Sequence, residues 1–123
     1  MSRTTPESLV VTAIVKAIYA QYPEAHVVKI HGSLYQASGF PDLLAFVNGR
    51  AYGLEVKRQR NGESAQRARN RSTPLQKLTI AKLRKAGITA DTVLSPSEAL
   101  AVIQGGHKFL ENSDLPNLLT SEQ

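Results

Sequence analysis

The pattern of apolar and polar positions predicts short helices and strands along most of the chain. Apolar residues spaced by three and four predict a first helix that follows a cap at Thr5 and ends near Tyr22. Mostly apolar runs then predict three strands, over residues 26–30, 43–47 and 50–57. Because the last two runs are apolar on both faces, we expect them to lie in the middle of a sheet.

Caps and stop residues predict the elements of the second half. Thr73 caps a helix whose apolar stripe begins at Leu75 and which ends at Gly87. A strand over 88–94 and a helix over 95–104 follow. The order of helix, three strands, helix, strand and helix predicts an α/β fold with a mixed sheet flanked by helices and a parallel crossover through the second helix.

The turn between the second and third strands fixes which residues face each other. Asn48 and Gly49 both tolerate positive φ, so they predict a two-residue hairpin turn. Pairing the residues outward from this turn puts Asp42 directly opposite Glu55. Lys57 follows Glu55 by two residues and therefore lies on the same face of its strand.

Two acids placed opposite each other repel. At a separation of about 5 Å and an effective dielectric constant of about 20, the repulsion between Asp42 and Glu55 is roughly 3 kcal/mol. A divalent cation would compensate it, and Lys57 would add a further positive charge. An ordinary Glu-Lys pair on a solvated strand is the alternative, but it fits buried central strands less well.

Length and composition limit the domain organisation and the location. With 123 residues, 41% of them hydrophobic, the chain can build one core, and we expect a domain over 1–104. The tail over 105–123 has no clear period, so packing on the domain, contact with a partner and disorder all stay open. Cysteine is absent, no apolar run could span a membrane, and the first residues lack the core of a signal peptide. We therefore expect a soluble, cytoplasmic protein.

Positive charge is concentrated in one segment. Residues 57–85 contain ten basic residues and one acid, whereas the rest of the chain contains five basic residues and nine acids. We expect residues 59–72 to form a polar, mobile loop, and the basic segment fits a polyanion such as nucleic acid. A loop that only aids solubility is the alternative. The residues expected to contact nucleic acid are Arg58, Arg60, Arg67, Arg69, Arg71 and Lys77.

Four pieces of the sequence, taken in order, resemble a known family. They are Glu7 on the first helix, Gly39-Phe40-Pro41-Asp42, Gly53-Leu54-Glu55-Val56-Lys57, and Ser72-Thr73-Pro74-Leu75-Gln76. This set is similar to the PD-(D/E)XK nuclease superfamily, whose core order is αβββαβ, and most closely to the small stand-alone VRR-NUC (virus-type replication-repair nuclease) proteins of phages. The resemblance covers roughly residues 5–104.

The resemblance implies roles for the matching residues. Asp42 and Glu55 match the carboxylates that bind the catalytic metal, and Lys57 matches the residue that orients or polarises the attacking water. Further contributors implied by the family are the carbonyl oxygen of Val56, the extra acid Glu7 and the supporting glutamine Gln76. The arginine-rich insertion between Lys57 and Ser72 departs from the family pattern. Without the family, Gln76 would be interpreted as a solvent-facing helix residue and Glu7 as a partner of the helix dipole.

The residue types also fit the chemistry of phosphodiester hydrolysis. Ligands that are all oxygens favour a hard ion, so we expect Mg²⁺, with Mn²⁺ as a substitute. The expected function is a metal-dependent DNA nuclease, and the resemblance to replication and repair nucleases points to flap or junction substrates. A catalytically inactive nucleic-acid-binding module of the same fold and an RNA nuclease are the alternatives. Whether the protein forms a homodimer stays open.

Overall fold

The computed structural model describes residues 6–30, 38–105 and 107–116. Thr5, the expected cap of the first helix, lies outside these residues. The described elements, in chain order, are α1 (Pro6–Gln21), β1 (His26–Lys29), β2 (Leu43–Val47), β3 (Arg50–Val56), α3 (Ala65–Asn70), α4 (Pro74–Lys85), β4 (Thr89–Val93), α5 (Pro96–Ile103) and the 3₁₀-helix η1 (Asn112–Asp114). Apart from α3 and η1 these are the predicted elements, with ends that differ by a few residues at most.

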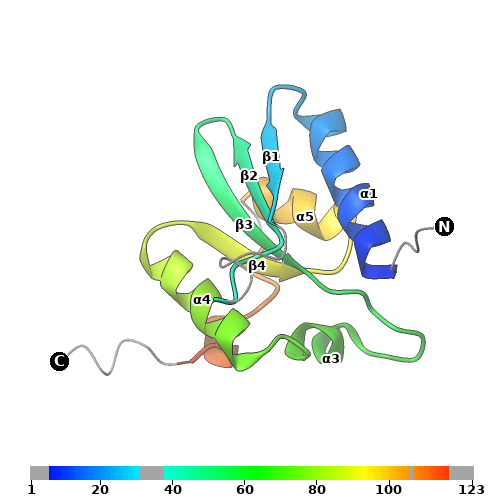
Figure 1. Cartoon of the computed structure of the whole chain (residues 1–123), viewed down its shortest axis with the longest axis vertical. Coiled ribbons are helices and arrows are strands. Elements are labelled where there is room, and N and C mark those ends of the chain that lie inside the picture. Colours follow the sequence, from blue (N-terminus) through cyan, green and yellow to red (C-terminus); the bar gives the residue numbers. More distant parts are fainter. Residues whose placement is uncertain (1–5, 31–37, 106, 117–123) are drawn as a thin grey trace.

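Four strands form one mixed sheet in the order β1-β2-β3-β4. The β1–β2 and β2–β3 pairs are antiparallel, and β3 and β4 are parallel. The chain between β3 and β4 passes through α3 and α4, so the predicted crossover is confirmed (Figure 1). The predicted α/β class is therefore confirmed, and β2 and β3 are the two central strands.

Helices cover both faces of the sheet (Figure 1). On one face, α1 and α5 pack against β2 and β3 through fully buried side chains that include Ile14, Leu43 and Leu54. On the other face, Ile80 of α4 packs against Ala90 of β4. Among the described residues, no helix is long and apolar enough to cross a bilayer.

The β2–β3 hairpin has the predicted turn and register. Asn48 has φ 51° and Gly49 has φ 78°, and positive φ at both central residues matches the twist of the flanking strands. Val47 pairs with Arg50, and the ladder continues to the pair of Leu43 and Leu54. The next step outward from that last pair leads to Asp42 and Glu55.

The prediction that residues 59–72 form a mobile loop is wrong for part of that segment, which forms the short helix α3. Ser64 caps the helix by accepting a hydrogen bond from the Arg67 amide at 3.1 Å. Ala68 is fully buried, and an ion pair of 2.5 Å joins Arg69 to Glu98 on α5. Tertiary contacts therefore hold a helix too short to show an apolar stripe in the sequence.

The first turn of α4 has both halves of a capping box. Thr73 Oγ1 accepts from the Gln76 amide at 3.1 Å, and Gln76 Oε1 accepts from the Thr73 amide at 2.9 Å. The cap predicted at Thr73 is confirmed. Leu75, expected in the apolar stripe, is instead 44% exposed, and Ile80 is the residue of this helix that is buried.

The described part of the expected tail packs on the domain. Leu110 is 1% exposed and contacts Ile80 and Ala90. The buried carboxylate of Asp91 accepts hydrogen bonds from the amides of Phe109, at 2.6 Å, and Leu110, at 2.7 Å. Of the three arrangements that the sequence leaves open, residues 107–116 thus adopt packing on the domain. The core continues beyond residue 104.

Candidate active site

The two predicted acids lie at the same end of the β2–β3 hairpin, away from its turn. Asp42 directly precedes β2, and its Oδ2 accepts a hydrogen bond of 2.7 Å from the Val56 amide near the end of β3. A Cβ added at Gly53 would meet the side chains of Pro41, at 3.2 Å, and Leu83 of α4, at 3.5 Å. Glu55 follows Gly53 by two residues, so it also faces α4.

Glu55 is held by two neighbours through one of its oxygens. The Nε2 of Gln76 donates to Glu55 Oε2 at 2.9 Å, and the Nζ of Lys57 lies 3.5 Å from the same oxygen. The other oxygen, Oε1, is buried and has no hydrogen-bond partner among the described residues. Since Glu55 is only 2% exposed, this oxygen is cut off from solvent while keeping its full capacity to accept.

The electrostatics of the pair are those of a buried acid beside a half-buried one. Burial and, after it, the negative charge of Asp42 raise the pKa of Glu55 from 4.5 to about 8, although Lys57 partly offsets both effects. Burial also raises the pKa of Asp42, and the hydrogen bond from the Val56 amide lowers it. The site therefore lacks enough positive charge of its own to keep both acids ionised.

Glu7 lies in the first turn of α1 and is half-buried. Its charge contributes to raising the pKa of both Asp42 and Glu55, after the larger effect of burial in each case. Within 6–30, 38–105 and 107–116, no three acidic or histidine side chains form a group that could hold a metal. Glu7 thus acts on the acid pair through its charge in this structure.

The residues present fit a hard divalent cation. The donors at the site are carboxylate oxygens, which Mg²⁺ and Mn²⁺ prefer. The unpartnered Oε1 of Glu55 has a lone pair available for a ligand, and a cation between Asp42 and Glu55 would offset their repulsion. Asp42, Glu55, Lys57 and Gln76 come together as predicted from the sequence, whereas the structure leaves the carbonyl of Val56 without a defined role.

The predicted nucleic-acid contacts divide into two groups. Arg69 pairs with Glu98 and lies over the ring of Phe109 at 5.0 Å, and Arg71 pairs with Glu63 at 2.9 Å and donates to the carbonyl of Arg58. These two guanidinium groups therefore hold α3 in place. The side chains that keep more freedom are those of the exposed Arg60 and Arg67 and of the half-buried Arg58 and Lys77.

One contact that supports the site was not assigned from the sequence. Gly39, with φ 79°, lies so close to α4 that an added Cβ would be 2.6 Å from the Leu75 carbonyl oxygen and 2.9 Å from the Gln76 nitrogen. Thr79 Oγ1 also donates to the Ser38 carbonyl at 2.7 Å. The loop that leads to Asp42 therefore rests on the helix turn that carries Gln76. The sequence signal for this contact was Gly39 itself, three residues before Asp42.

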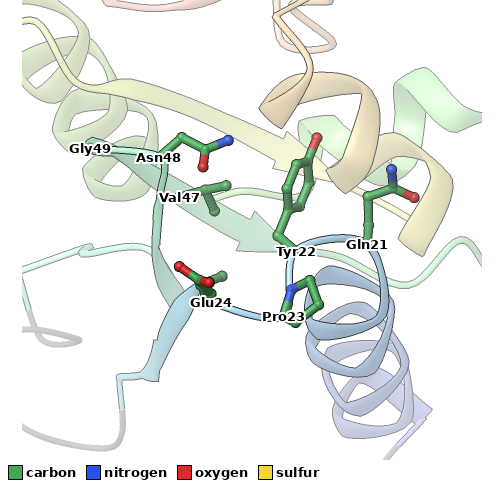
Figure 2. A pocket seen from close by; sticks show the side chains of 8 residues that line it. Gln21, Tyr22, Pro23, Glu24, Val47, Asn48 and Gly49 are labelled. Carbon is green, nitrogen blue, oxygen red and sulfur yellow. The ribbon is translucent and has the colours of Figure 1, made fainter.

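A separate hollow lies at the opposite end of the sheet, between the end of α1 and the β2–β3 turn (Figure 2). It has a volume of about 600 Å³ and is lined by residues that include Tyr22, Glu24 and Asn48. Glu24 is the single acid in its lining, and none of the predicted site residues reaches it. The acid pair and this hollow are thus distinct features.

Comparison with known proteins supports the fold. No protein-family model matches the sequence, and no curated protein matches it. A solved structure described as "VRR_NUC domain" is similar to this chain with a TM-score of 0.52 and 23% sequence identity, and the match covers 76% of this chain and 94% of that one. The chain therefore has the fold of a VRR_NUC domain, the family that its motifs resemble.

Proposed function

We propose that this protein is a metal-dependent nuclease that hydrolyses phosphodiester bonds in DNA. The observation that carries the proposal is the buried carboxylate of Glu55, whose Oε1 lacks a partner among the described residues while Asp42 stands beside it. Burying two acids together is costly unless a cation compensates them. The Lys57 ammonium 3.5 Å from Glu55 adds the positive group that phosphoryl chemistry uses.

The proposed roles follow from these positions. A bound Mg²⁺ or Mn²⁺ would polarise the scissile phosphate and lower the pKa of the attacking water. Asp42 and Glu55 would hold the ion, and Gln76 fixes Oε2 of Glu55 through its hydrogen bond. Lys57 would orient the water and offset charge that develops on the phosphate. Additional proposed ligands are the carbonyl of Val56 and the carboxylate of Glu7.

The same proposal assigns the DNA backbone to the basic segment next to the site. Phosphates attract mobile, exposed cations, and each contact made by one of them releases counterions. Arg69 and Arg71 are already engaged in ion pairs, so their proposed contribution is to hold α3 against the domain. The residues proposed to contact phosphates directly are Arg58, Arg60, Arg67 and Lys77.

A cleavage assay tests the proposal. Wild-type protein with Mg²⁺ or Mn²⁺ is mixed with linear duplex, flap and four-way-junction DNA and with matched RNA. We expect metal-dependent cleavage of DNA that disappears in EDTA and in Asp42→Asn. Binding without cleavage on every substrate would favour an inactive binding module, and preferential cleavage of the RNA set would identify an RNA nuclease.

Two lysine variants separate binding from catalysis. Lys57→Ala should lose most of the cleavage while DNA affinity falls only modestly, because one cation of ten in the segment adds little to counterion release. Lys82→Ala, an exposed lysine on α4, removes the same charge away from the acids and should leave the cleavage rate near that of the wild type. If Lys57→Ala cleaved DNA as fast as Lys82→Ala, Lys57 would have no role in the mechanism.

A further inference from the structure

A buried hydroxyl lies next to the acid pair. Thr92 on β4 is the register partner of Glu55 on the parallel strand β3, and it is fully buried. Side chains of register partners point to the same face of a sheet. Two pairs earlier, and therefore on the same face, a Cβ added at Gly53 would lie 3.6 Å from the Cβ of Ala90, which shows how closely β3 and β4 side chains approach there. Thr92 therefore stands beside Glu55, on the side facing α4.

Both side chains keep an unused polar atom. Among the described residues, neither Thr92 Oγ1 nor Glu55 Oε1 has a hydrogen-bond partner. Leaving a buried hydroxyl unpaired is unfavourable, and valine has the same shape without that cost. A threonine at this place in a buried strand thus calls for a reason other than stability, and the free oxygen on the neighbouring acid offers one.

We infer that Thr92 is a positioning residue for the proposed metal site. Its hydroxyl donates to Oε1 of Glu55 when that carboxylate is charged and holds the ion. A carboxylate oxygen has two lone pairs, so one can accept from the hydroxyl while the other binds the metal. Gln76 and Lys57 hold the opposite oxygen, and Thr92 would complete the second sphere that fixes the carboxylate plane. This inference rests on the proposed function.

Thr92→Val is the test, because it removes only the hydroxyl. Thr89→Val, at the exposed first residue of the same strand, is the matched control, and Thr92→Ser restores the hydroxyl. Mn²⁺ affinity is measured by calorimetry without DNA, and melting temperature is measured in EDTA. We expect Thr92→Val to bind Mn²⁺ about tenfold more weakly, as is typical when a second-sphere partner is lost. We expect Thr92→Ser and Thr89→Val to bind Mn²⁺ as the wild type does.

The metal-free melting temperature shows whether the hydroxyl serves the fold instead. We expect Thr92→Val to melt at the wild-type temperature or above it, since an unpaired hydroxyl has been removed. A lower melting temperature in EDTA, or Mn²⁺ affinity equal to that of the wild type, would overturn the inference and leave the proposed nuclease function intact. A wild type that neither binds Mn²⁺ nor cleaves DNA would overturn both.

Discussion

Replacing Glu55 with glutamine should stabilise the metal-free protein at neutral and alkaline pH. Burial and the neighbouring charge of Asp42 raise the pKa of Glu55 from 4.5 to about 8. The native state therefore binds a proton more tightly than the unfolded state, and stability falls as pH rises through this window. Glutamine keeps an oxygen that can accept from Gln76 Nε2 but never ionises.

The magnitude follows from the same values. Each pH unit between 4.5 and 7 costs the wild type about 1.4 kcal/mol of folding free energy, so at pH 7 the total is roughly 3 kcal/mol. Near pH 5 most of this cost is absent. We thus expect Glu55→Gln and the wild type to have similar stabilities at pH 5, and the variant to be more stable by roughly 3 kcal/mol at pH 7.

Urea unfolding in EDTA at pH 5, 7 and 8.5 measures this difference. Glu24→Gln, at an exposed acid in the turn before β1, makes the same chemical change away from the site and should alter stability by no more than about 0.5 kcal/mol. Adding Mg²⁺ at about a hundred times its dissociation constant should stabilise the wild type by roughly 2.7 kcal/mol and leave Glu55→Gln unchanged. Parallel pH curves for the wild type and Glu55→Gln would refute the reasoning about the buried acid.

Three further predictions concern the loop before Asp42, the packed tail and the basic segment. Gly39→Ala should weaken Mn²⁺ binding measured by calorimetry, because its Cβ would collide with the first turn of α4. Gly87→Ala, also at positive φ but in open space, should lose less stability and keep its Mn²⁺ affinity. Asp91→Asn should destabilise the fold by about 1–3 kcal/mol in urea unfolding and speed amide exchange at residues 109 and 110, since two backbone amides lose a charged acceptor. An unchanged exchange rate there would contradict that role. Replacing Arg58, Arg60 and Arg67 together with glutamine should flatten the slope of log affinity against log salt on duplex DNA by about two to three. An unaltered slope would exclude these three side chains from the interface.

Local signals in the sequence were enough to predict the hairpin and its consequences. Asn48 and Gly49 determine the turn, the turn determines the register, and the register brings Asp42 and Glu55 together. The capped start of α4 at Thr73 was equally local. Such features depend on neighbouring residues alone, and for that reason spacing along the chain was sufficient to find them.

Features that depend on distant contacts could not be predicted in this way. Helix α3 has a single fully buried residue, Ala68, and its ion pair with Glu98 joins residues 29 positions apart. The packing of Leu110 depends on a hydrogen bond to Asp91 of β4, 19 residues earlier in the chain. No sequence pattern near Asp91 indicates this partner. The unpaired oxygen of Glu55 likewise results from burial in the folded chain, and no local pattern encodes it.

The capping box of α4 gives the side chain of Gln76 a fixed polarity. The Gln76 Oε1 accepts a hydrogen bond from the backbone N–H of Thr73, which can only donate. The side-chain amide of Gln76 therefore cannot flip without losing the cap. The NH₂ group is therefore always the end that faces Glu55. A glutamate at position 76 would preserve the cap but present an acceptor to another acceptor, so the helix could form normally while the acid pair lost its support. The cap of α4 thus determines that the site receives a hydrogen-bond donor at position 76. Sequence rules for helix caps accept glutamate there and would not detect the loss of that donor.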